Sequence, residues 1–224
     1  MGALVVAVDG PAGSGKSSVS KAVARELGYS YYDTGAAYRA LACAVLDAGG
    51  DPTDQDAVLE LQNTVTYVAS EDPDHQYFSV DGVDVTDAIR GHEVSSNVSA
   101  IAQHPSVRQG LVDHFRSVLR ACEKPGIVME GRDITTVVAP DAPVRILLTA
   151  DEETRIARRQ AEVAGVVAAP SVAQALSSRD RSDQTVVDFM NAAPGVTLVD
   201  STPLTFDETV RELLRIIANI KENA

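Results

Sequence analysis

The sequence predicts an α/β fold in which helices flank a parallel β-sheet, with a small antiparallel β insertion. One observation is a short apolar run, residues 4–8, that leads directly into a glycine-rich octet and then a helix-forming stretch, residues 18–27. A second is the pair of continuous apolar runs at residues 127–129 and 144–148, which are typical of buried parallel strands. Because these runs alternate with helical periodicity, they indicate a single layered α/β domain.

The remaining elements follow from periodicity and from turn residues. Alternating apolar positions between residues 63 and 90 predict three short β segments, which form the antiparallel insertion. Val107, Leu111, Phe115 and Leu119 share one face of a helix, and this stripe predicts packing against the core. Short strands are expected at residues 29–32 and 196–199, and helices at residues 35–48, 93–103, 105–122, 151–164, 171–180 and 205–221.

The glycine-rich octet, residues 10–17, has the sequence GPAGSGKS and the full spacing of a phosphate-binding P-loop. Glycines let successive backbone N–H groups point into one concavity, where the following helix presents its positive N-terminal end. Lys16 can then reach the terminal phosphates of a nucleoside triphosphate, and the Ser17 hydroxyl can coordinate a phosphate-bound Mg²⁺. The residues expected to bind ATP here are Gly10, Pro11, Ala12, Gly13, Ser14, Gly15, Lys16, Ser17 and Ser18.

Composition excludes several classes of protein. The net charge of −13 over 224 residues argues against a nucleic-acid partner, because neutralising many phosphates requires a basic surface. Two cysteines without paired spacing, Cys43 and Cys122, indicate neither a disulfide framework nor a zinc site. The same cysteine usage favours a reducing cytoplasm. No apolar run reaches membrane-spanning length, so we expect no membrane partner. We expect a monomer, because no exposed apolar helix face remains unassigned.

Four clusters of polar residues stand near expected strand ends or helix starts, where open α/β sheets bind ligands. They are residues 33–39 (DTGAAYR), Ser99 with Arg108, residues 130–133 (EGRD), and the series Arg155, Arg158, Arg159, Arg179 and Arg181, interleaved with Asp180 and Asp183. Each cluster also has a structural interpretation, as a helix cap with a surface ion pair, a strand-end ion pair or a solvated face. Phosphoryl transfer favours the functional interpretation, because it requires Mg²⁺, a lysine and several converging arginines.

In their order and spacing, these segments resemble the bacterial cytidylate kinases over nearly the whole chain. The matching segments are GPAGSGKSS at 10–18, YDTGAAYR at 32–39, the β insertion, VR at 107–108, EGRDITTVV at 130–138, PDAPVRILLTA at 140–150 and RIARR at 155–159. The resemblance implies transfer of the γ-phosphoryl group of ATP to CMP or dCMP, giving CDP or dCDP. It also implies Mg²⁺, bound as Mg-ATP, as the cofactor.

The resemblance further implies a role for each matching residue. Thr34, Arg108 and Asp133 would contact the cytosine, while Tyr38, Arg39 and Arg132 would line the side that takes the acceptor phosphate. Ser99, Arg179 and Asp183 would hold the ribose, and Arg155 and Arg159 would bind ATP. Lys16, Arg39, Arg132 and Arg159 would be catalytic. Within a single kinase domain, residues 1–224, the insertion at 63–90 would be a monophosphate-binding subdomain and residues 155–190 a helical lid.

Two positions depart from the pattern of that family. The family usually has Gly-Arg-Asp-Ile-Gly-Thr, whereas Thr135 stands at the second glycine here. A β-branched residue tolerates positive φ poorly, so we expect a different local backbone if the glycine used that conformation. In the lid, Val186 stands where the resemblance implies an arginine on the acceptor phosphate, and Arg181 is a candidate substitute.

Two other interpretations of the P-loop stay open at the level of sequence. One is a P-loop kinase for another nucleotide or small molecule, and the other is a catalytically weak nucleotide-binding relative. An adenylate kinase would lack the β insertion, and a GTP-dependent switch would carry an Asn-Lys-x-Asp motif that is absent from this sequence. Product formation with a panel of monophosphates separates these possibilities.

Overall fold

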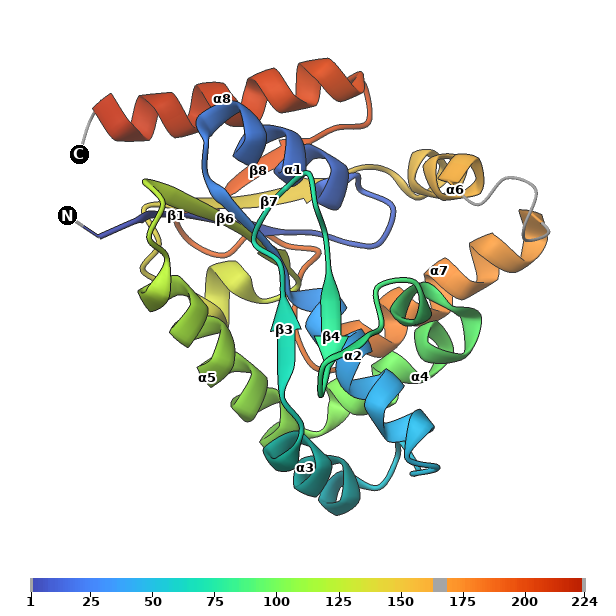
Figure 1. Ribbon diagram of the computed structural model, residues 1–224. Helices are drawn as coiled ribbons and strands as arrows, with labels where there is room; N and C mark the ends of the chain where they lie inside the picture. The colour runs from blue at the N-terminus through green and yellow to red at the C-terminus, as the bar shows by residue number, and fades with distance from the viewer. Residues whose placement is uncertain (1, 163–168, 223–224) are drawn as a thin grey trace.

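The computed structural model describes residues 2–162 and 169–222 and contains a parallel sheet of five strands (Figure 1). The strands are β1 (Leu4–Asp9), β2 (Ser30–Asp33), β6 (Gly126–Gly131), β7 (Val144–Thr149) and β8 (Thr197–Asp200), in the order β2-β6-β1-β7-β8. In the central pair, Asp9 of β1 stands opposite Gly131 of β6. The carboxyl ends of these two inner strands therefore lie side by side, at the end of the sheet where all five parallel strands finish.

Helices cover both faces of this sheet. On one face, α1 (Lys16–Leu27) and α8 (Phe206–Glu222) contribute Val23 and Leu213 to a cluster of buried apolar side chains. On the other, α2 (Thr34–Asp47), α4 (His92–Gln103) and α5 (Pro105–Ala121) form a second cluster. The helices α6 (Glu152–Glu162) and α7 (Ala169–Gln184) lie together beyond the carboxyl end of β7 (Figure 1). All of these helices were predicted, with boundaries that differ by a few residues.

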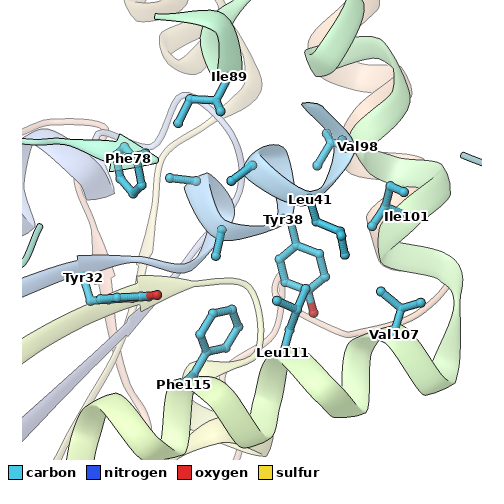
Figure 2. Close-up of a cluster of buried hydrophobic side chains, with 14 of the residues drawn as sticks. Tyr32, Tyr38, Leu41, Phe78, Ile89, Val98, Ile101, Val107, Leu111 and Phe115 are labelled. Carbon is cyan, nitrogen blue, oxygen red and sulfur yellow. The ribbon is translucent and has the colours of Figure 1, made fainter. Parts of the chain in front are cut away.

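The cluster around α2 shows why the apolar stripe of α5 packs inward (Figure 2). Val107, Leu111 and Phe115 are all buried, and the Phe115 ring lies 6.1 Å from the ring of Tyr38 on α2. Leu119, the last member of the predicted stripe, is only partly buried against the same cluster. The stripe is therefore core, as expected from its spacing.

The β insertion is an antiparallel sheet of three short strands, β3 (Tyr67–Ala69), β4 (Phe78–Val80) and β5 (Val83–Asp84), as predicted. Helix α3 (Gln55–Thr64), which precedes it, was not predicted. Val58 is the one buried residue of α3, so the helix shows little apolar periodicity. The Asp54 carboxylate caps it by accepting from the backbone N–H groups of Asp56 and Ala57. A short 3₁₀ turn, Ala88–Arg90, leads from the insertion to α4.

The structure also bears on the cysteines and on membrane insertion. Cys43 and Cys122 are both free thiols, in agreement with the absence of paired spacing. Among the described helices, none combines the length and the apolar character that a membrane span requires.

Candidate active site

The P-loop connects β1 to α1 and is shaped by glycine. Gly13 and Gly15 have φ of 75° and 86°, in the left-handed region that other residues adopt only under strain. A Cβ at Gly13 would also lie 2.7 Å from the backbone oxygen of Arg155, so α6 packs directly on the loop. The Ser14 hydroxyl is buried and has no hydrogen-bond partner among the described residues. The loop therefore holds an unused polar group, as a phosphate-binding site would.

Lys16, Ser17 and Glu130 converge where the P-loop meets the end of β6. The Lys16 ammonium donates to the backbone oxygen of Pro11 at 3.3 Å. Burial raises the pKa of Glu130, and the Lys16 charge and a hydrogen bond with Ser17 oppose that shift. Tyr31 donates to the Glu130 carboxylate at 2.8 Å. Because Mg²⁺ prefers hard oxygen ligands and keeps phosphates in its shell, the Ser17 hydroxyl and the Glu130 carboxylate fit a Mg-ATP site. Sequence reasoning assigned no role to Glu130, although an acid that ends a buried strand was the available signal.

The DTGAAYR segment, residues 33–39, leads from the end of β2 into α2. Asp33 caps α2 by accepting from the Ala36 N–H and pairs with Arg39 at 3.0 Å, as the structural interpretation expected. Thr34 is buried and donates to the backbone oxygen of Glu130 at 2.8 Å, which joins β2 to the EGRD segment. The Tyr38 hydroxyl is buried without a hydrogen-bond partner among the described residues.

A buried ion pair joins Arg108 of α5 to Asp133, which follows β6. Their side chains are 16% and 6% exposed, so the pair is largely removed from water. Burial raises the pKa of Asp133, while Arg108 opposes the shift by charge and by a hydrogen bond. Burial also raises the pKa of Tyr38; the charge of Asp133 adds to that rise and the charge of Arg108 opposes it. The resemblance placed Arg108 and Asp133 on the cytosine together with Thr34, and that role stays a prediction.

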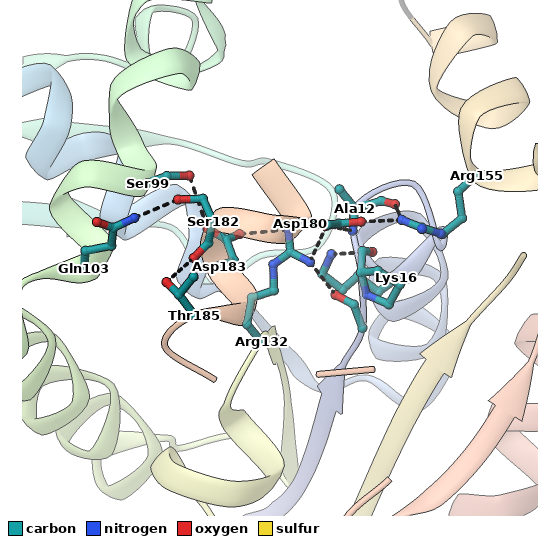
Figure 3. Close-up of polar contacts among 12 residues, drawn as sticks. Ala12, Lys16, Ser99, Gln103, Arg132, Arg155, Asp180, Ser182, Asp183 and Thr185 are labelled. Carbon is teal, nitrogen blue, oxygen red and sulfur yellow. Dashed lines mark hydrogen bonds and ion pairs between the residues drawn. The ribbon is translucent and has the colours of Figure 1, made fainter. Parts of the chain in front are cut away.

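Arg132 lies between the P-loop and α7 (Figure 3). Its guanidinium pairs with Asp180 at 3.0 Å and with Asp183 at 2.9 Å, and its carbon atom Cζ lies 4.2 Å from the Phe189 ring centre. Asp183 also accepts from the Ser99 hydroxyl at 3.2 Å. The structure thus brings together Ser99, Arg132 and Asp183, which the sequence placed on two sides of the acceptor.

The arginines of α6 divide between two environments. Arg155 is 6% exposed and donates to the backbone oxygen of Ala12 and to Asp180. Arg158, to which sequence reasoning gave no role, donates to the Ser14 oxygen at 3.1 Å and to the Ser201 hydroxyl at 2.9 Å. Arg159 is exposed. Arg155 and Arg158 therefore hold the outer side of the P-loop, whereas Arg159 faces solvent.

Part of the expected lid lies outside the described residues. Of residues 155–190, the structure describes α6, α7 and the segment that follows, but not residues 163–168 or the Arg179 side chain. Arg181 is exposed in the last turn of α7, and Val186 is partly buried just beyond it, with its N–H bonded to the Asp183 oxygen at 3.1 Å. The proposed exchange of roles between Arg181 and Val186 stays a prediction.

Thr135 lies in a short π-helix, Ile134–Val138, and its backbone is not strained. Asp81 is the only non-glycine residue with positive φ in the described parts of the chain. Instead, the Thr135 N–H and hydroxyl both donate to Asp9 Oδ2, at 2.8 Å and 2.6 Å, and the Ile134 N–H donates to Oδ1 at 2.8 Å. Burial raises the Asp9 pKa to about 6, and the Thr135 hydroxyl limits that rise. The threonine thus supplies a donor that glycine lacks.

Replacing Thr135 with valine is expected to destabilise the fold in a pH-dependent way. At about pH 8, where Asp9 is ionised, loss of the hydroxyl should cost about 1.5–3 kcal/mol, the usual range for a hydrogen bond to a charged group. The Asp9 pKa should rise above its value of about 6. The loss should therefore shrink as the pH falls through that pKa, because protonated Asp9 needs the donor less. Urea unfolding at about pH 8 and at a pH below the Asp9 pKa of about 6 measures the effect. Thr135→Ser is the control that keeps the hydroxyl. Equal losses at the two pH values would contradict this role.

Comparison with known proteins agrees with this geometry. The family model described as cytidylate kinase matches residues 6–219. Cytidylate kinase from Cutibacterium acnes is 46% identical over 216 residues, which cover 96% of each chain. Cytidylate kinase from Mycobacterium avium is 43% identical over 226 residues and covers 99% of this chain and 98% of its own.

A solved structure supports the fold alone. An uncharacterized protein from Eubacterium ventriosum superposes with a TM-score of 0.54 at 12% identity, covering 96% of this chain and 98% of its own. The family is therefore assigned from the family model and from the two relatives, which match nearly the whole chain. The chain belongs to the cytidylate kinase family.

Proposed function

We propose that this protein transfers the γ-phosphoryl group of ATP to the 5′-phosphate of CMP or dCMP, giving CDP or dCDP. The observation that carries this proposal is the buried Arg108–Asp133 pair. Asp133 directly follows Arg132, whose guanidinium donates to the backbone oxygen of Gly10 in the P-loop at 3.4 Å. The family supplies the nucleotide kinase activity, and the Arg108–Asp133 pair supplies a reason for the choice of cytosine.

On the donor side, the P-loop amides and the Lys16 ammonium would hold the β- and γ-phosphates of ATP. When bound, Mg²⁺ neutralises phosphate charge, and the Ser17 hydroxyl and the Glu130 carboxylate are the residues that would hold it. We expect Arg159, exposed on α6, to act on the phosphates from the solvent side.

On the acceptor side, Arg39 and Arg132 would bind the monophosphate, because a planar guanidinium binds two phosphate oxygens at once and stays charged. The acceptor phosphate is already an ionised nucleophile, so the reaction needs no strong general base. Ser99 and Asp183, which are hydrogen-bonded to each other, would hold the ribose together with Arg179.

Base selection would depend on Asp133. A carboxylate held by Arg108 can accept a hydrogen bond from the exocyclic amine of cytosine. The O4 atom of uracil would instead meet it with two acceptors facing each other, which leaves both without a proton. The Thr34 hydroxyl at the start of α2 would contact the base as an acceptor, because its proton is already donated to the backbone oxygen of Glu130.

The test is product formation from ATP with a panel of acceptors: CMP, dCMP, UMP and AMP, and shikimate or gluconate as hydroxyl acceptors. The specificity constant for CMP should exceed that for UMP by at least about tenfold. Similar constants for CMP, UMP and AMP would refute the account of the pocket, and absence of any product would favour a nucleotide-binding relative. Gel filtration during purification tests the expected monomer.

Val186, which stands in the lid where the resemblance implies an arginine, leads to one of two expected patterns of activity. If Arg181 has replaced the missing arginine, Arg181→Ala should lower CMP phosphorylation strongly, and Val186→Arg should change little. If nothing has replaced it, Val186→Arg should raise turnover by roughly tenfold, because it adds a charge-assisted contact in the transition state. Steady-state ADP release at saturating ATP and CMP distinguishes the two. A fast enzyme in which both substitutions are silent would contradict both patterns and leave the acceptor phosphate to Arg39 and Arg132.

A further inference from the structure

Asp180 of α7 is the point at which three separate segments of the site meet (Figure 3). One carboxylate oxygen accepts from the P-loop N–H of Ala12 at 3.2 Å and pairs with Arg132 at 3.0 Å. The other oxygen accepts from Arg155 of α6 at 2.5 Å. Asp180 is 5% exposed, so all three contacts lie away from bulk water. Sequence reasoning gave this residue no role, since it looked like one of several mixed charges on a helix.

The two arginines do not depend on Asp180 to the same extent. Arg132 has a second carboxylate partner, Asp183, and rests on Phe189. Arg155 donates otherwise only to the backbone oxygen of Ala12 in the described part of the chain, and its Nε atom is buried without a partner there. A buried guanidinium without a counter-charge destabilises the folded state, so the Asp180 carboxylate is what stabilises Arg155 in its buried position.

The geometry of these contacts also restricts where each guanidinium can go. A free arginine side chain samples many rotamers, and binding to a buried carboxylate selects a few of them before any ligand arrives. Since Asp180 is itself fixed to the P-loop backbone through Ala12, it relates both arginines to the loop that would hold ATP. Groups arranged in advance around the phosphates lower the barrier more than groups that must reorganise.

We propose that Asp180 is a positioning residue for phosphoryl transfer, which sets the places of Arg132 and Arg155 relative to the P-loop. Both oxygens of the Asp180 carboxylate are engaged by protein groups, so Asp180 acts through the two arginines. The inference rests on the proposed function, because Arg132 and Arg155 matter to the reaction only as parts of a nucleotide kinase site. It predicts that one substitution in α7 affects the use of both substrates.

The main test is Asp180→Asn, which keeps the shape and removes the charge. We expect kcat with ATP and CMP to fall at least about tenfold and the KM values for both to rise. The matched control is Ser182→Ala on the same helix. This substitution removes the hydrogen bond that Gln103 donates to the Ser182 hydroxyl at 2.8 Å, but it removes no contact with an arginine. The kcat and KM values of the control should therefore stay within about twofold of those of the unmodified protein. If both variants lose activity alike, general docking of α7 is what matters and the proposal is overturned. If Asp180→Asn is as active as the unmodified protein or more active, the carboxylate competes with phosphate rather than positioning the arginines, and the proposal is also overturned.

Two further measurements separate positioning from folding and from a failure of the proposed function. Asp180→Glu keeps the charge but moves it by one methylene, and it should fold and still lose activity, whereas full activity would show that position is immaterial. In a double-mutant cycle, Arg155→Met combined with Asp180→Asn should be little worse than the more damaging single variant, because Asp180→Asn already removes the contact that positions Arg155. Additive losses would contradict the proposal. Activity of the unmodified chain towards CMP is measured in the same series, so an inactive parent would count against the function and not against Asp180.

Discussion

Replacing Lys16 with alanine is expected to lower phosphoryl transfer by about a hundredfold or more while leaving the fold intact. Lys16 is the first residue of α1, and its ammonium bonds to the backbone of the P-loop rather than to the core. Removing a preorganised cation from the charged transition state costs on the order of 3 kcal/mol or more. The measurement is the steady-state rate of ADP release with ATP and CMP, together with a thermal unfolding curve.

Lys124→Ala is the control, because Lys124 is exposed in the turn before β6 and lies outside the site. It should match the unmodified protein in rate and in unfolding temperature. A folded Lys16→Ala protein with full activity would refute the kinase assignment.

Replacing Asp133 with asparagine is expected to remove the preference for CMP. The amide presents an N–H donor where the carboxylate presented only acceptors, so it can bond to O4 of uracil and no longer favours the cytosine amine. Loss of a hydrogen bond to a charged acceptor costs about 1.5–3 kcal/mol, which corresponds to at least about tenfold in the specificity constant for CMP. The constants for CMP and UMP, measured side by side, should become similar or reverse.

The matched control is Asp113→Asn on α5. Asp113 is exposed and pairs weakly with Arg116 at 4.0 Å. Its replacement removes an aspartate charge from the helix that also carries Arg108 but leaves Asp133 unchanged. Both specificity constants should stay unchanged in this variant. If Asp133→Asn lowered the constants for CMP and UMP by the same factor, Asp133 would support the pocket without reading the base.

Local patterns were sufficient to predict the P-loop, the buried strands and most helices, because each depends on residues adjacent in sequence. Helix α3 was missed because it buries only Val58, and its main signal is the Asp54 cap. A shared role for Arg108 and Asp133 followed only from a family resemblance, and their ion pair was not predicted, since nothing local brings α5 to the end of β6. Asp180 and Arg158 could not be assigned from sequence, because their roles depend on how α6 and α7 pack against the P-loop.

The pairing of β1 with β6 has a consequence for the evolution of substrate range in this fold. Neighbouring strands are about 4.8 Å apart, and Asp9 and Gly131 are register partners. The segment that would hold the donor and the segment that carries Arg132 and Asp133 therefore leave the sheet from adjacent strands at equal height. The separation of the two strand ends is set by backbone hydrogen bonds and does not depend on the β insertion. The insertion is therefore free to diverge in length and sequence, and so to admit other acceptors, while the distance over which the phosphoryl group travels stays the same.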